Sequence, residues 1–197
     1  MASKTLLIPV ASMAEPDKVN FLELAVEPAD GLKPDDALQA LGQVGLALQQ
    51  AAAAALRAWT AFAPPETVKV RLANPVGVNV TNSRGAALGL ALSPFLHGPD
   101  APYRVAIVMG GLEFLEDGLL VVSPTDCLAE ILRAIQARGY RMEPVLLILP
   151  WDGCGEEEEA ILLNLAALNI AVRRVNTFAE ACWACEGRIE RRVRARP

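Results

Sequence analysis

Ser83 is the residue with the clearest chemical signal in the chain. It begins the stretch Ser83-Arg84-Gly85, which leads into small and apolar residues that predict a helix ending between Pro94 and Gly98. A serine hydroxyl can attack a carbonyl carbon, but only when a neighbouring base activates it. Thr81 and Asn82 stand beside Ser83, and all three are residue types that cap helices. Two interpretations are therefore open, a nucleophile and a helix cap.

Few groups could serve as a base for Ser83. The four lysines are Lys4, Lys18, Lys33 and Lys69, so none follows residue 69. The single histidine, His97, lies fourteen residues along the same predicted helix, about 20 Å away at a rise of about 1.5 Å per residue. Asp126 and Glu130 remain as candidates, but a lone carboxylate is a weak base for a serine hydroxyl at neutral pH. Arg133 stays protonated and accepts no proton.

The cysteines give a second, weaker signal. Cys182-Trp-Ala-Cys185 has the spacing of a redox pair or of half a zinc site. It falls inside a predicted helix, and the other soft ligands, Cys127, Cys154 and His97, are scattered along the chain. We therefore expect reduced thiols, with no metal and no cofactor. The sequence also has no Gly-x-x-x-x-Gly-Lys phosphate loop.

Two strands and a long helix are predicted before this region. Lys4–Val10 and Asn20–Val26 have the composition of strands, and the polar connection between them predicts a hairpin. A helix begins at Pro34 and must end before Pro64 and Pro65, which cannot continue it. Further strands are expected at Thr67–Leu72 and at Gly77–Val80.

The second half alternates strands with helices. Ser123 and Pro124 predict a helix start, Gly139 predicts its end, and Thr177 with Glu180 forms a capping box for the last helix. Acidic residues open another helix at Glu156. The predicted strands are 103–109, 119–122, 145–149 and 170–175. This alternation favours a single α/β (α+β) domain over residues 1–197, in which mixed sheets pack with helices, ending in a basic tail at about 187–197.

Several of these segments, in this order, resemble the proteolytic domain of Lon-type proteases. Ser83-Arg84-Gly85 keeps the Ser-x-Gly core of the family's Gly-Pro-Ser-Ala-Gly motif, and the helix after it fits without a gap as far as Gly98. The segments 105–111 and 118–122 are similar to two family strands, and 128–139 to the helix that carries the catalytic lysine. The segments 145–150 and 170–180 are similar to the later strands and the last helix. The resemblance thus covers nearly the whole chain.

The resemblance implies a ribosomal protein S5 domain 2-like fold and a serine–lysine dyad. Ser83 falls on the nucleophile, whereas an alignment shifted by four positions would put Ala87 there. The lysine position falls between Ala129 and Ile131, so Glu130 stands near the place of the missing base. Either alignment leaves the dyad incomplete. We therefore expect a catalytically inactive Lon-protease-like domain; the alternative is an atypical serine peptidase that uses Ser83 with a non-lysine base.

Charge and hydropathy restrict the partners. A formal charge of −5 argues against a general nucleic-acid binder, the arginine-rich tail being the one local exception. No apolar run reaches the length of a membrane span, so we expect no membrane partner and a cytoplasmic protein. With 53% hydrophobic residues, the chain has much apolar surface to cover. We expect a homo-oligomer, since Lon-type domains form rings, and a role in assembly or in binding a protein partner.

Overall fold

The computed structural model describes most of the second half of the chain, and three strands and one helix of the first half. The described residues are 4–11, 19–28, 68–72, 85–92, 102–114, 120–123, 128–140, 144–151 and 154–187. The helix expected between Pro34 and Pro64, the strand expected at Gly77–Val80 and the tail after Gly187 lie outside these ranges.

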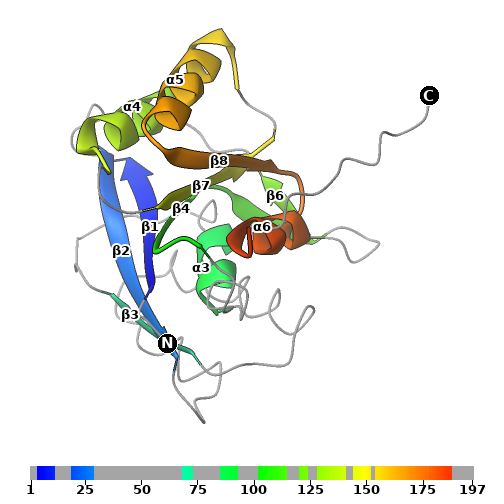
Figure 1. Cartoon of the computed structure of the whole chain (residues 1–197). Helices are drawn as coiled ribbons and strands as arrows, with labels where there is room; N and C mark the ends of the chain where they lie inside the picture. The colour runs from blue at the N-terminus through cyan, green and yellow to red at the C-terminus, as the bar shows by residue number, and fades with distance from the viewer. Residues whose placement is uncertain are drawn as a thin grey trace.

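Six of the described strands form one mixed sheet in the order β3-β2-β1-β4-β7-β8 (Figure 1). Neighbours are antiparallel from β3 to β1 and parallel from β1 to β8. The strands are β1 (Lys4–Ala11), β2 (Val19–Pro28), β3 (Val68–Leu72), β4 (Val105–Val108), β7 (Val145–Pro150) and β8 (Ile170–Val175). The predicted α/β class, a mixed sheet packed with helices, is confirmed.

The two halves of the sheet form for different local reasons. β1 and β2 pair along their length, with Lys4 opposite Val26 and Ala11 opposite Val19, so the predicted hairpin is confirmed. β4 and β7 have every residue buried. Strands covered on both faces carry continuous apolar runs instead of alternating ones, and this is why short Val, Ile and Leu runs mark them in the sequence.

Helices α4 (Leu128–Arg138) and α5 (Glu156–Ala167) cover one face of the sheet (Figure 1). Their buried side chains form one core with alternate residues of the strands, because successive strand residues point to opposite faces. Most of this core is branched aliphatic: Leu7, Ile107, Ile131, Leu132, Ile135, Leu147, Leu149, Ile161, Leu162 and Leu165.

Helices α3 (Gly85–Leu92) and α6 (Phe178–Cys185) lie on the opposite side of the sheet (Figure 1). Here the packing uses small residues. A Cβ added at Gly89 would lie 2.8 Å from Cε2 of Phe178, so the ring of α6 occupies the space that a larger residue on α3 would need. Phe178 is itself fully enclosed. The two helices thus approach each other closely because residue 89 has no side chain.

The start of α6 matches its predicted capping box, and the end of α4 matches its predicted stop. The Glu180 amide donates to Thr177 Oγ1 at 3.2 Å, and the Thr177 amide donates to Glu180 Oε2 at 3.1 Å. After α4, Gly139 has a φ of 64°, a left-handed conformation that glycine adopts without a steric penalty. The predicted start of α4 near Ser123 and Pro124 lies partly outside the described residues.

One described element was not expected. β5 (Gly111–Phe114) pairs with β6 (Leu120–Ser123) as a separate antiparallel ribbon, Gly111 lying opposite Ser123. The sequence analysis predicted β6, but it ended the preceding strand at Met109 and expected no strand at 111–114. One glycine and one glutamate among its four residues hide the strand signal in β5, because glycine and charged residues are depleted in strands. The pairing with β6 forms this strand.

Within the part of the chain that the structure describes, no helix has the length and apolar character needed to cross a membrane.

Candidate functional site

The candidate site lies around the first turn of α3. The Ala86 amide donates to the Gly110 carbonyl at 3.3 Å, which ties this turn to the bend after β4. Gly110 has a φ of 115°, a conformation that side-chain-bearing residues rarely adopt. A Cβ on Gly85 would lie 3.2 Å from the Leu112 amide nitrogen, a backbone atom that cannot easily give way. Small residues therefore let α3 begin directly against the β4–β5 bend.

Ser83, the candidate nucleophile, precedes Gly85 by two residues and lies outside the described residues, as do Asp126 and His97. Neither the nucleophile nor the helix-cap interpretation is tested. Ala87, which a shifted alignment would put at the nucleophile position, lies within α3 and is fully buried. Its methyl group packs in the interior and offers no reactive atom.

Glu130, the candidate near the missing lysine, lies on the exposed side of α4. Its neighbours Ala129 and Ile131 are both buried, and Ile131 belongs to the core under α4 and α5. The side chains that α4 buries are all apolar. The inner side of this helix therefore carries no group that could accept or donate a proton.

Arg133, the nearest cation on α4, is engaged elsewhere. Its guanidinium pairs with the Glu157 carboxylate of α5, and both side chains are more than half exposed. A pair of this kind contributes little to stability because water screens it. Arg133 thus links the outer surfaces of α4 and α5.

The Cys-x-x-Cys motif lies within α6, and Cys182 and Cys185 are both buried. Among the residues described here, no three His, Cys, Asp or Glu side chains gather closely enough to hold a metal ion. Cys154 is the most accessible described thiol. Burial raises its pKa, the nearby Arg174 guanidinium lowers it, and two carboxylates of α5 raise it, with a net increase. Cys154 therefore stays protonated at neutral pH and is a poor nucleophile.

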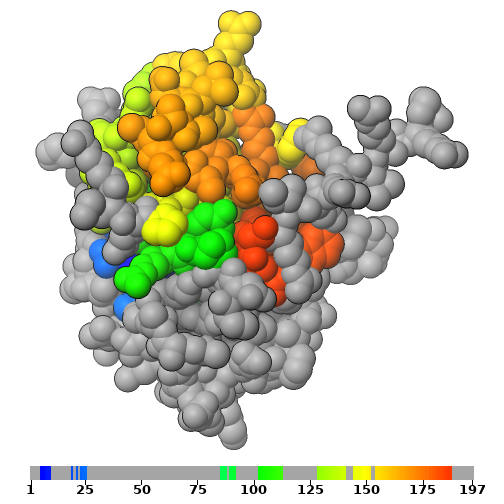
Figure 2. Space-filling view, in the orientation of Figure 1, coloured from blue at the N-terminus to red at the C-terminus, as the bar shows by residue number. Residues whose placement is uncertain are grey.

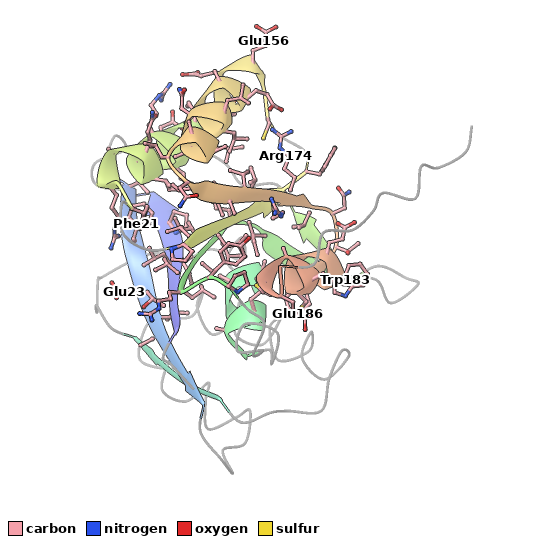
Figure 3. The ribbon with its side chains drawn as sticks, viewed as in Figure 1. Phe21, Glu23, Glu156, Arg174, Trp183 and Glu186 are labelled. Carbon is pink, nitrogen blue, oxygen red and sulfur yellow. The ribbon has the colours of Figure 1, made fainter. Side chains whose placement is uncertain are left out.

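A polar cluster that the sequence did not predict lies where β7 and β8 end. Arg174 on β8 pairs with Glu159 of α5 at 2.6 Å, and its guanidinium carbon lies 6.0 Å from the ring centroid of Trp151, just after β7. Figure 3 shows Arg174 beside α5. Parallel strands place their carboxyl ends at one edge, so the position of Trp151 after one predicted strand and of Arg174 near the end of the next was the usable signal.

A second cluster lies at the C-terminal end of α4. The guanidinium carbon of Arg138 is 5.0 Å from the ring centroid of Phe21 on β2 and 5.7 Å from that of Tyr140. Burial raises the pKa of the Tyr140 hydroxyl, which therefore stays protonated at neutral pH. The cluster joins the end of α4 to the hairpin, and nothing in it is poised to react.

No protein-family model matches this chain. No curated protein has significant sequence similarity to it.

Proposed function

We propose that the chain is a Lon-proteolytic-domain-like protein that has lost its catalytic dyad and acts in assembly or in binding a protein partner. The order of its motifs, from Ser83-Arg84-Gly85 to the last helix, is the basis for the Lon-like, ribosomal protein S5 domain 2-like assignment. The mixed sheet packed with helices is consistent with such a fold at the level of its class.

The main support for a loss of catalysis comes from the side chains that α4 buries. The resemblance puts the family's lysine between Ala129 and Ile131, and this chain has apolar side chains buried at both positions. Glu130 between them is exposed. Because a serine hydroxyl needs a general base, a helix that buries only hydrocarbon there supports a non-catalytic role.

Exposed apolar side chains support the binding role. Leu163 on α5 is 72% exposed, Leu168 is 47% exposed and Trp151 is 40% exposed. Scattered surface leucines are ordinary, but the sequence as a whole has a mean hydropathy of +0.30. A domain that covers such side chains with another protein removes apolar area from water, which stabilises the complex.

A peptidase assay tests this proposal. The purified chain is incubated with an unfolded casein-like substrate, with and without ATP, beside an active Lon-type protease as the positive control. We expect no cleavage, and no difference between the chain and Ser83→Ala. Ser93→Ala removes a different serine hydroxyl and serves as the matched control. Peptidase activity that disappears in Ser83→Ala but persists in Ser93→Ala would establish the competing hypothesis, a serine hydrolase with a non-lysine base.

A further inference from the structure

Among the described strands, β8 is the last of the six-stranded sheet and pairs only with β7. The Val175 carbonyl accepts a hydrogen bond from the Trp151 amide at 2.9 Å, so the backbone groups of Val175 point toward β7. Successive residues of a strand turn their backbone groups to alternate sides. The amides and carbonyls of Val172 and Arg174 therefore point away from the sheet. We call the outward backbone groups of these two residues the β8 edge.

Arg173 lies directly at the β8 edge. Its guanidinium donates to the Val172 carbonyl at 2.9 Å, as expected for a carbonyl that points away from β7. Within the described part of the chain, Arg173 pairs with no carboxylate, in contrast to Arg133 and Arg174. Its charge is thus held at the β8 edge by one hydrogen bond to a neighbouring backbone atom. In Figure 2, orange atoms between α5 and the red α6 lie open on the viewed face.

The two faces beside the β8 edge differ in chemistry. Val172 packs against the core under α4 and α5, on the face where Arg174 pairs with Glu159. Arg173 lies on the other face, which α6 covers, because neighbouring residues of a strand alternate. A strand added at this edge would therefore meet an apolar side chain on one face and a positive charge on the other.

We infer that the β8 edge binds an extended segment of a partner protein in which apolar and acidic residues alternate. This inference rests on the proposed binding role and names its surface and the chemistry of its partner. The backbone of the segment bonds to Val172 and Arg174, the mode of recognition in which main-chain bonds give affinity and alternate side chains give specificity. Its apolar side chains extend the core beside Val172.

An acidic side chain of the segment pairs with Arg173 on the α6 face. The guanidinium then exchanges a backbone carbonyl for a carboxylate, and a hydrogen bond between two charged groups is stronger than one to a neutral acceptor. This exchange also leaves the Val172 carbonyl open to the added strand. The acidic first turn of α5, Glu156–Glu159, lies on the opposite face and would repel acidic side chains there. We therefore expect the acidic residues of the segment on the α6 face alone.

The charge of β8 favours such a partner over a second copy of this chain. If two β8 strands paired about a twofold axis along most of their length, the arginines of one copy would lie opposite or diagonal to those of the other. Like charges facing each other on paired strands are destabilising. Arg173 thus opposes self-association at the β8 edge while it favours an acidic segment.

The central test measures binding of the fluorescent peptide Thr-Val-Glu-Val-Glu-Val-Thr to the full chain by fluorescence anisotropy. A version with lysine at both acidic positions is its control and should bind about tenfold more weakly. Arg173→Glu should weaken the acidic peptide about tenfold and strengthen the lysine version by a similar factor. Arg104→Glu is the matched control, the same change on an exposed arginine before β4, two strands away. It should leave both dissociation constants within about threefold.

Amide hydrogen exchange in the unchanged chain distinguishes strand addition from binding elsewhere. With the acidic peptide bound, the amides of Val172 and Arg174 should exchange about tenfold more slowly or less, because they then donate to the peptide. The amides of Ala171 and Arg173 point toward β7 in both states and should not change. This alternation is a signature that a charge contact alone would not give.

Three results would overturn this inference. They are no binding of the acidic peptide at about 1 mM, binding that leaves the Val172 and Arg174 amides unchanged, and a dimer of the chain alone in which these amides are protected. The third result, seen by light scattering and hydrogen exchange, would make a second copy the occupant. Thermal unfolding checks that both variants remain folded. The peptidase assay decides the loss of catalysis separately, so failure of these binding tests leaves its result unchanged.

Discussion

The two faces of the central sheet are filled in different ways. Under α4 and α5 the core consists mainly of leucine and isoleucine, and the gaps are filled by large side chains on both the helices and the strands. Under α3 and α6 much of the contact depends on glycine and alanine: Gly85, Ala86, Ala87, Gly89, Ala91, Ala181 and Ala184 are all buried. On one face the helices supply large aliphatic side chains, and on the other they supply mainly small residues, which let the backbones approach closely.

This difference predicts different responses to mutation. A face filled by large aliphatic side chains loses stability mainly when a side chain is shortened, because a cavity remains. A face built on small residues is also sensitive to enlargement, because no space is left for an added methyl group. Residues near the first turn of α3, where the candidate site lies, belong to the second kind.

The largest effect is expected from Phe178→Ala. Phe178 is a large ring on the small-residue face, and it is 1% exposed. Removing the ring should lower the free energy of unfolding by about 3–5 kcal/mol, measured by urea denaturation. Leu163→Glu, on an exposed position, is the control and should change stability by less than about 1 kcal/mol in the monomer. A loss below about 1 kcal/mol for Phe178→Ala would mean that this face collapses freely around the gap.

An intermediate effect is expected from Gly89→Ala. The new Cβ would lie 2.8 Å from Cε2 of Phe178, so the ring or the helix must move. Overpacking of this kind costs about 1–3 kcal/mol, and the helix preference of alanine over glycine returns at most about 1 kcal/mol.

The double variant Gly89→Ala with Phe178→Leu sharpens this test. The smaller side chain at residue 178 should relieve the contact, so Gly89→Ala should be neutral or stabilising in the Phe178→Leu background. A double-mutant cycle measures this coupling directly. Equal effects of Gly89→Ala in both backgrounds would show that the closeness of α3 and α6 does not arise from this pair.

The smallest effect is expected from Thr177→Ala, which removes the cap of α6. The lost hydrogen bond to the Glu180 amide should cost about 1 kcal/mol, seen as a lower midpoint in thermal unfolding. Thr177→Ser keeps the hydroxyl and should recover most of that loss. If both substitutions had the same effect, the cap would matter less than the methyl group of Thr177.

Much of the secondary structure was predictable from local sequence. The β1–β2 hairpin, the capping box at Thr177 and the stop at Gly139 depend on residues close together in the chain, and all three are confirmed. β5 was missed because its stability depends on its partner β6 and not on its own composition. The structure tests only part of the predicted candidate site, since Ser83 lies outside the described residues and its proposed role stays a prediction.

Among the described residues, the sequence by itself determined the approximate place of most strands and helices, and it determined that no lysine follows residue 69. These properties follow from residue types and short spacings, through backbone preferences, caps and the period of apolar residues. Only the tertiary structure decided that Glu130 is exposed while Ile131 is buried, that Arg174 meets Trp151, and that α5 leaves Leu163 on the surface. Such placements depend on contacts between distant segments. A helix whose sequence is apolar on several sides does not reveal which side the sheet will cover.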